Sequence, residues 1–173
     1  FDYAVDAHQY QRRKSGEAYI FHPISVAKIV ASEIGLDAVS IAAALIHDVV
    51  EDNSNHTLEN IQKEFGKNIS KIVDGLTKIG KLNSKGYSDV SIQAENYRKM
   101  LLTLNEDVRV IIIKIADRLH NMQTLSSMPY EKQIQKASET LYIYAPLAHR
   151  IGLYNIKTEL EDLGLKYTDP ETY

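Results

Sequence analysis

The residues with the clearest chemical potential form one short stretch in the first third of the chain. His47, Asp48, Glu51 and Asp52 place an imidazole and three carboxylates within six positions, directly after the apolar run 41–46. The apolar run predicts a buried helix, and ionisable groups that are buried must be paired or bound to a metal. The negative pole at a helix end also favours a cation. The stretch therefore indicates a metal site, or else a hydrogen-bonded core histidine followed by solvated acids.

A second polar group lies on the stretch 107–122, which is apolar at 110–113 and ionisable at its far end. Four apolar residues in a row are also typical of a buried strand, but the length of the stretch favours a central helix. On a helix, Lys114, Asp117, Asn121 and Thr124 form one polar line, because residues three and four apart share a face. The line predicts a cleft, unless it is a surface stripe with a weak pair between Lys114 and Asp117.

A basic cluster, Arg12-Arg13-Lys14, leads into the turn signal Ser15-Gly16-Glu17. Such a cluster is usually a solvated turn. Glycine nevertheless permits close approach of a ligand, and arginine offers a planar fork that binds phosphate or stacks on a base. His22 follows at the start of a helix, since Pro23 suits a first helical turn.

The elements that must position these side chains are helices separated by turn signals. Asp37 and Thr57 are predicted N-caps, while Gly35, Gly66 and Gly152 are predicted to end helices. The tail 164–173 is interpreted as strand, linker or frayed end, and 80–89 as an exposed loop. The predicted fold is all-α, with helices over about 2–11, 22–34, 38–51, 57–65, 69–79, 90–104, 107–122, 131–144 and 156–163, and a short one from Pro146.

Composition narrows the function classes. The chain has 173 residues, no cysteine and a net charge of −3. It therefore has no disulfides or zinc thiolates, and it lacks the broad positive charge of a nucleic-acid-binding protein. It has neither a membrane span nor a signal peptide, so we expect one soluble, cytoplasmic domain. The first residue is Phe1 rather than a start methionine, so we expect this sequence to be a piece of a longer chain.

Other catalytic patterns are missing from the sequence. It contains no phosphate-loop, dinucleotide-binding, nucleophile-elbow or zincin motif. What remains is His22, then His47-Asp48, then the distant Asp117. Two imidazoles and two carboxylates suit a Mn²⁺, Fe²⁺ or Zn²⁺ centre with open positions for water and substrate oxygen.

This H…HD…D pattern resembles that of the HD metal-dependent phosphohydrolases, a helical superfamily that acts on phosphate esters. Longer strings extend the likeness over essentially the whole chain. They are similar to the N-terminal hydrolase domain of bifunctional RelA/SpoT homologues, and they comprise 13–23 (RKSGEAYIFHP), 47–52 (HDVVED), 116–122 (ADRLHNM) and 144–148 (YAPLA).

The resemblance implies a role for each matching residue. The metal ligands would be His22, His47, Asp48 and Asp117, usually with Mn²⁺ as the ion. Glu51 and Asp52 would orient or deprotonate the attacking water and help the leaving group. The nucleotide would be held by Arg13, Lys14 and Ser15 at the guanine end, with Asn121 and Thr124 lining the pocket.

The implied activity is that of a guanosine-3′,5′-bis(diphosphate) 3′-pyrophosphohydrolase of the stringent response, which converts (p)ppGpp to GDP or GTP and pyrophosphate. In long members the tail 164–173 would lead toward a synthetase domain of the same chain. Two alternatives stay open: an HD phosphohydrolase for another nucleotide, and a nucleotide-sensing domain without catalysis. The string 13–17 argues against the first alternative, and the full set of ligands and acids argues against the second.

Overall fold

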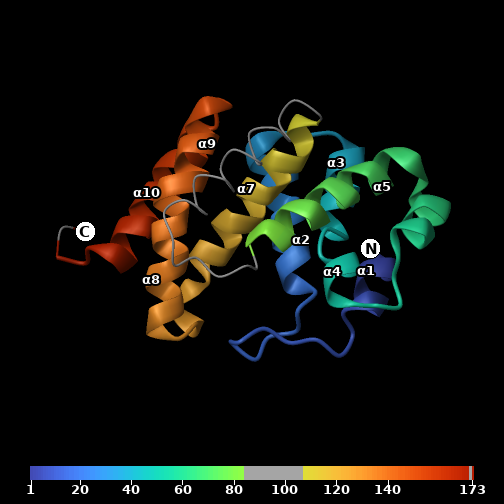
Figure 1. The fold of residues 1–173 in the computed structure, drawn as a ribbon, viewed down its shortest axis with the longest axis horizontal. Helices are drawn as coiled ribbons and strands as arrows, with labels where there is room; N and C mark the ends of the chain where they lie inside the picture. Colours follow the sequence, from blue (N-terminus) through green and yellow to red (C-terminus); the bar gives the residue numbers. More distant parts are fainter. Residues whose placement is uncertain (84–106, 172) are drawn as a thin grey trace. The chain divides into compact units, whose positions relative to one another are not determined.

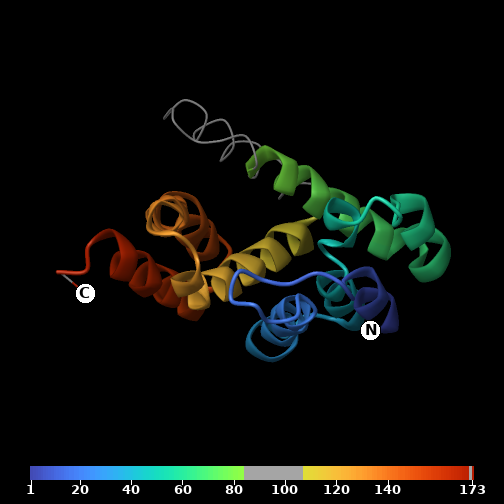
Figure 2. The ribbon, with the colours of Figure 1, turned by 90° about the horizontal axis from the view of Figure 1, so that it is seen from below.

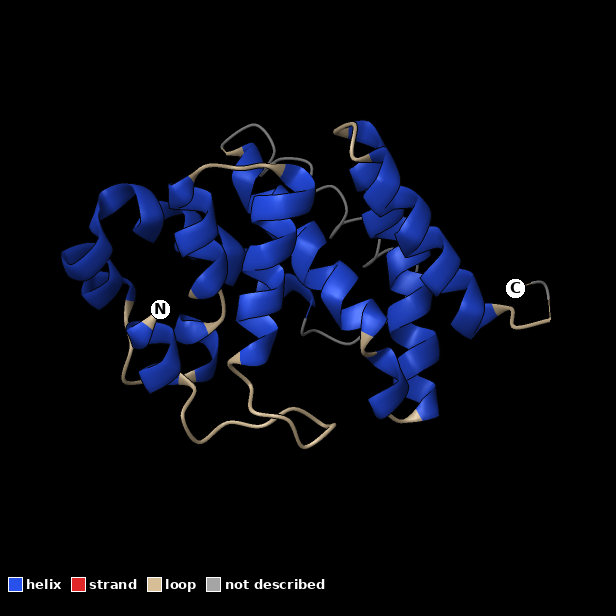
Figure 3. Ribbon diagram, turned by 180° about the vertical axis from the view of Figure 1, so that it is seen from behind, coloured by secondary structure: helices blue, strands red, loops and turns tan. Residues whose placement is uncertain are grey.

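The computed structural model describes residues 1–83, 107–171 and 173, and all regular elements within those ranges are helices (Figures 1 and 3). The predicted all-α class is confirmed. None of the helices described is both long and apolar enough to cross a membrane. The chain forms two compact parts. They are an N-terminal part (1–11 and 18–114) and a C-terminal part (12–17 and 115–173).

The N-terminal part is built on helices whose apolar residues meet in one core. Its α2 packs against α3, and α3 packs against α5. Val26, Val30, Ala43, Ile72 and Leu76 are buried there. The elements are α1 (Asp2–Ala7), α2 (Phe21–Lys28) with its π-helical continuation η1 (Ile29–Ile34), α3 (Ala38–Leu45), α4 (Val49–Asp52) and α5 (Leu58–Asn83).

The predicted helix signals of this part are confirmed. Asp37 caps α3, because its carboxylate accepts the Ser40 N–H at 2.9 Å. Thr57 likewise accepts the Asn60 N–H at 3.2 Å. Gly66, with φ of 85°, bends α5, which Figures 1 and 2 show in green, at the position where we predicted a break.

Three predicted boundaries of this part are wrong. The first helix ends at Ala7, four residues early, because the Gln9 and Gln11 N–H groups bond three residues back and turn the chain. The helix that follows Asp37 ends at Leu45, and residues 46–48 form a turn before α4. Helix α5 continues to Asn83, into the predicted loop 80–89. The rest of that loop, and the helix predicted over 90–104, lie outside the described residues.

The C-terminal part is a group of helices around Leu119, Tyr144, Leu147 and Leu160, which are buried. Its α10 packs against α8, η3 and α9. The predicted central helix is confirmed as α7 (Val108–Gln123), whose residues from Ile115 onward belong to this part. The remaining elements are the 3-10 turn η2 (Leu125–Ser127), α8 (Tyr130–Glu139), the π-helical turn η3 (Thr140–Tyr144), α9 (Ala145–Arg150) and α10 (Tyr154–Thr168).

The tail is helical where a strand, linker or frayed end was expected. Helix α10 passes through Gly164 and ends at Thr168. Gly164 is buried, and a Cβ added there would lie 2.6 Å from Leu141 Cγ. The glycine thus serves close packing against the Leu141 side chain rather than helix termination.

Candidate functional site

The metal-type residues of the N-terminal part lie together. His22 stands in the first turn of α2, and His47 and Asp48 occupy the turn between α3 and α4. One ligand atom from each lies within 4.8 Å of the others, and they form the metal-type cluster among the described residues. Both imidazoles are almost fully buried, at 2% and 1% exposure, whereas Asp48 is 13% exposed. The cluster therefore opens toward solvent at its carboxylate.

The hydrogen bonds of the cluster fit a cation. His47 Nδ1 lies 2.7 Å from the Ala44 carbonyl oxygen, which can only accept, so Nδ1 carries the proton. In a neutral ring, Nε2 then presents a lone pair to Asp48 Oδ2 at 2.9 Å. The Nε2 lone pair and the carboxylate oxygen repel each other at that distance unless a cation lies between them. That cation is either a second proton on His47 or a metal ion. A backbone carbonyl that fixes the tautomer is also the usual outer partner of a metal-bound histidine.

Tyr19 adds a partner that the sequence did not reveal. Its hydroxyl donates to Asp48 Oδ2 at 2.6 Å, and its ring lies edge-on to His22, with ring centroids 5.6 Å apart. A donor on this oxygen favours the ionised carboxylate, which is the form that binds metals. Tyr19 thus orients one candidate ligand and packs against another.

The two acids after the cluster have different surroundings. The Asp52 N–H bonds to the Asp48 carbonyl at 2.9 Å, four residues back, as in an α-helical turn. The Glu51 N–H bonds to the same carbonyl at 3.0 Å rather than to the carbonyl of His47. The Glu51 carboxylate lies against Gly80 of α5, where an added Cβ would collide with it. Asp52 Oδ2 instead accepts from Gln11 Nε2 at 2.8 Å.

The C-terminal part gathers three of the predicted nucleotide-binding residues. The guanidinium of Arg13 donates to Asn121 Oδ1 at 3.0 Å and to Thr124 Oγ1 at 2.9 Å. The loop that carries Arg13 is closed by hydrogen bonds from the Arg13 N–H to the Glu17 carbonyl and from the Gly16 N–H to the Arg13 carbonyl, each 2.9 Å long. Gly16 adopts φ of 88°, a conformation that glycine allows freely. The basic turn is therefore an ordered loop bound to the polar line of α7.

The other predicted residues of this part behave differently. Lys14 and Ser15 are exposed at the tip of the loop. Asp117 is buried on α7, where its Oδ1 accepts from Asn121 Nδ2 at 2.7 Å. Asp117 and Arg13 thus share Asn121 as a hydrogen-bond partner, with the amide donating to one and accepting from the other.

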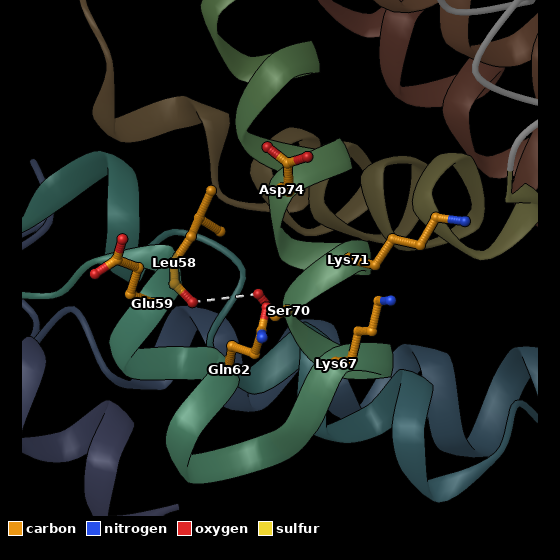
Figure 4. Close-up of a pocket in the computed structure, with 7 residues that line it drawn as sticks. All are labelled: Leu58, Glu59, Gln62, Lys67, Ser70, Lys71 and Asp74. Atoms are coloured by element: carbon orange, nitrogen blue, oxygen red, sulfur yellow. Dashed lines mark hydrogen bonds between the residues drawn. The ribbon is translucent and has the colours of Figure 1, made fainter.

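A separate hollow lies over the bend of α5 and contains none of the predicted residues. Figure 4 shows the Ser70 hydroxyl donating to the Leu58 carbonyl across it, at 3.2 Å. Lys67 and Lys71 extend toward one side of the view, while the Asp74 carboxylate points elsewhere. Its charged groups do not converge on one point, so the predicted residues, and not this hollow, define the candidate site.

Comparison with known proteins identifies the family. Residues 1–154 match the family model of the HD domain, which covers most of the chain. The chain therefore belongs to the HD-domain family.

Relatives within the family carry a particular name. Proteins named guanosine-3′,5′-bis(diphosphate) 3′-pyrophosphohydrolase from Aquifex aeolicus and Vibrio cholerae are each 49% identical to the chain, over 100% and 98% of its length. The bifunctional (p)ppGpp synthase/hydrolase SpoT of Escherichia coli K12 is 48% identical over 98% of the chain. The chain spans 24% of the length of each of these curated relatives.

A solved structure extends the likeness to three dimensions. It belongs to a metazoan orthologue of SpoT that is described as hydrolysing ppGpp and playing a role in starvation responses. The two chains superpose with a TM-score of 0.71 at 26% identity, over 94% of this chain and 89% of the other. The all-α arrangement is thus the fold of a known ppGpp hydrolase.

Sequence reasoning missed Tyr19 and Gln11. Tyr19 is 29 residues away from Asp48, and Gln11 is 41 residues away from Asp52. Tyr19 lies within the string 13–23 that carries the family resemblance, so its presence there was the available signal. No local spacing pointed to Gln11, because its contact depends on the folded path of the chain.

Proposed function

We propose that this chain removes the 3′-pyrophosphate of (p)ppGpp, giving GDP or GTP and pyrophosphate. The observation that carries the proposal is the match to the metazoan ppGpp hydrolase, which spans nearly the full length of both chains. The two proteins share this fold, and the described activity of the metazoan protein is the one we propose for this chain. Relatives that are 49% identical and carry the hydrolase name support the same substrate.

The proposed metal ligands are His22, His47, Asp48 and Asp117. The first three meet in the N-terminal part, and the resemblance of the sequence to the H…HD…D pattern adds Asp117. A divalent ion fits their chemistry, since carboxylate and imidazole together suit the harder first-row metals, and we propose Mn²⁺. When bound, the ion supplies a Lewis acid for phosphoryl oxygen and for water.

The proposed reaction is a hydrolysis in which water is the second reactant. Water attacks the phosphorus attached to the ribose 3′ oxygen, and the bond between that phosphorus and the 3′ oxygen breaks. The water oxygen stays on the released pyrophosphate, and the departing 3′ oxygen takes up a proton to become the 3′ hydroxyl. A carboxylate must accept a proton from the water, and Asp52 is the better placed of the two acids, because Gln11 holds its carboxylate. Glu51 is proposed to support the same step from beside Gly80.

Recognition of the nucleotide is proposed for the loop 13–15 and the polar line of α7. The planar face of the Arg13 guanidinium would stack on the guanine end of the nucleotide. Its N–H groups already donate to Asn121 and Thr124, which fixes the orientation of the plane. Lys14 and Ser15, exposed beside it, would bind the same end of the nucleotide. Holding the guanidinium before the nucleotide arrives lowers the ordering entropy of binding.

A synthetase domain in the same full-length chain is the proposed partner. The support is that SpoT of Escherichia coli is named a bifunctional synthase/hydrolase and that the chain spans 24% of it.

The deciding experiment is hydrolysis of ppGpp by the purified chain with Mn²⁺, with products separated by chromatography. GDP and pyrophosphate in equal amounts are the expected products. Hydrolysis of other nucleotides but not of ppGpp would favour another HD phosphohydrolase. Tight binding of ppGpp without turnover would favour a sensing domain.

A further inference from the structure

Two side-chain hydrogen bonds join the end of α4 to the last residue of α1 and to the segment that follows it. Gln11 Nε2 donates to Asp52 Oδ2 at 2.8 Å, and Asn53 Nδ2 donates to the Ala7 carbonyl at 3.1 Å. Both bonds lie within the N-terminal part. Because Asp52 itself is exposed, packing alone does not orient its carboxylate. The Gln11 amide does.

Gln11 is itself held on every side. Its N–H bonds to the His8 carbonyl and its carbonyl accepts the Tyr19 N–H, both at 3.0 Å. Its Oε1 lies 2.7 Å from His8 Nδ1. The orientation of the amide follows from chemistry, since a carboxylate only accepts and the NH₂ end must therefore face Asp52. The oxygen end then faces His8, which must supply the proton from Nδ1.

His8 is a buried anchor at the far end of this chain of bonds. It is 2% exposed, and its Nε2 is buried without a hydrogen-bond partner among the described residues. The tautomer with its proton on Nδ1 satisfies Gln11 and leaves no unpaired N–H inside the core. The ring also packs on Tyr19, with centroids 4.8 Å apart, and the Tyr19 hydroxyl binds Asp48. One buried histidine thus supports both an acid and a candidate metal ligand.

We propose that His8 and Gln11 are positioning residues that hold the Asp52 carboxylate in place for proton transfer during hydrolysis. The proposal rests on the proposed function, because it assigns to Asp52 the role of base. Gln11 acts through Asp52 and His8 acts through Gln11, so neither need touch the nucleotide.

The kinetic test is a double-mutant cycle with ppGpp and Mn²⁺. Gln11→Ala should lower kcat roughly tenfold or more, the usual cost of losing an outer partner in such a site, with KM and metal content near those of the wild type. In an Asp52→Asn background the same substitution should change kcat little, because the carboxylate on which Gln11 acts is already gone. Gln9→Ala is the matched control, since Gln9 is exposed and its side-chain amide bonds to Asp6 at 3.4 Å.

Three kinetic results would overturn the proposal. They are an equal fall in kcat for Gln11→Ala in both backgrounds, a rise in KM without a fall in kcat, and an equal effect of Gln9→Ala. His8 is tested by two variants, because the larger change can disturb the core. His8→Asn keeps a donor near the position of Nδ1 and should retain most of the activity, whereas His8→Leu should match Gln11→Ala; the reverse order would contradict the assignment.

A second readout is independent of catalysis. The side-chain amide of Gln11 should give a distinct NMR signal in the metal-free chain, assigned by its loss in Gln11→Ala. That signal should move in Asp52→Asn and in His8→Leu, but not in Gln9→Ala. If the wild-type chain fails to hydrolyse ppGpp while the signal moves, the proposed function fails and the contact stands. If ppGpp is hydrolysed and the signal stays fixed, the positioning role is wrong.

Discussion

Asp52 and Glu51 are adjacent carboxylates, yet only Asp52 is oriented by Gln11. We therefore expect Asp52→Asn to lower kcat for ppGpp by about 10²–10⁴-fold, the range for loss of a general base, and Glu51→Gln to lower it less. Both changes keep the shape of the side chain while removing its basicity. Steady-state kinetics at saturating Mn²⁺ measures the difference, with metal content as the control. A larger loss for Glu51→Gln would move the base to Glu51.

Arg13 is predicted to act in binding more than in chemistry. Arg13→Ala should raise KM for ppGpp more than it lowers kcat, because stacking and charge at the guanine end act in the ground state and the transition state alike. Arg13→Lys keeps the charge but loses the fork that reaches both Asn121 and Thr124, so it should restore only part of the affinity.

The comparison that decides the role of Arg13 is with a neighbouring cation. Arg12→Ala removes an exposed guanidinium that bonds to the Gly16 carbonyl at 3.0 Å in the same loop. It should leave KM closer to the wild-type value. A fall in kcat alone for Arg13→Ala would place Arg13 at the reacting phosphate instead.

Residue types and spacing predicted the candidate ligands, but not their partners. His47 and Asp48 were recognisable because they follow an apolar run, and His22 through the H…HD…D pattern, and the three do meet in the fold. Gln11 and His8 carry no such mark, since an amide and a histidine in a polar segment are ordinary. The contact of Gln11 with Asp52 joins residues 41 positions apart, which local spacing cannot encode, and His8 contacts Gln11 rather than Asp52.

At the scale of elements, helix starts were easier to predict than helix ends. Asp37 and Thr57 mark starts through one local hydrogen bond each, so the sequence alone contains the cause. The break at 46–48 has no such marker, because it contains neither glycine nor proline and Asp48 makes no side-chain cap hydrogen bond to α4. The predicted helix 156–163 stopped before Gly164, whereas α10 continues through it. Gly164 instead makes room for the Leu141 side chain, a contact between separate helices.

A buried ion pair joins α7 to α8. Arg118 Nη2 lies 3.0 Å from Glu139 Oε2, with both side chains almost fully buried, and the guanidinium stands 4.1 Å from the centre of the Tyr144 ring. Burial opposes the charged form of Arg118, but Tyr144 and Glu139 outweigh it, so the pKa of the guanidinium is raised above its ordinary value. Glu139→Gln should therefore lower the free energy of unfolding by about 3–5 kcal/mol, because an uncompensated charge stays buried.

Urea unfolding of the metal-free chain measures this loss. Lys136→Met is the control, because Lys136 lies 3.5 Å from the same carboxylate but is 36% exposed. It should cost no more than about 1 kcal/mol, as partly exposed ion pairs do. Equal losses in the free energy of unfolding for the two variants would show that the buried Arg118–Glu139 pair contributes no more to stability than the partly exposed pair with Lys136.

The start of α7 should respond to acid. Arg109 Nη2 lies 2.8 Å from Asp107 Oδ2, and its hydrogen bonds hold the pKa of the Asp107 carboxyl below its ordinary value despite partial burial. A lowered folded-state pKa stabilises the fold above the unfolded pKa, near 3.9, and this contribution disappears as the pH falls through the folded value. Asp107→Asn should thus cost at most about 1 kcal/mol at pH 7 and nothing in strong acid.

Unfolding of the metal-free chain between pH 2 and 7 measures the effect, with wild type and Asp107→Asn compared at each pH. The two stability curves should converge below about pH 4. Curves that stay parallel over the whole range would show that the ionised Asp107 contributes nothing.

At the scale of the whole molecule, the proposed ligand set draws on both compact parts of the chain. His22, His47 and Asp48 belong to the N-terminal part and Asp117 to the C-terminal part. The sequence predicted this set from a family pattern that spans 96 positions, from His22 to Asp117. A pattern of that length reports a shared fold, which local spacing alone cannot do.

The last prediction tests that set through metal-dependent stability. An ion that binds the folded chain and not the unfolded one should raise the free energy of unfolding by about 2.7 kcal/mol at 100 times its dissociation constant. Asp48→Ala and Asp117→Ala should each reduce the Mn²⁺-induced rise and the bound metal, while Asp162→Ala, an exposed acid on α10, should reduce neither. Thermal unfolding with and without Mn²⁺, together with metal analysis, gives both readouts. If Asp48→Ala loses the metal but Asp117→Ala keeps it in full, the ion is held by the N-terminal part alone. Asp117 would then act through its hydrogen bond with Asn121 rather than as a ligand.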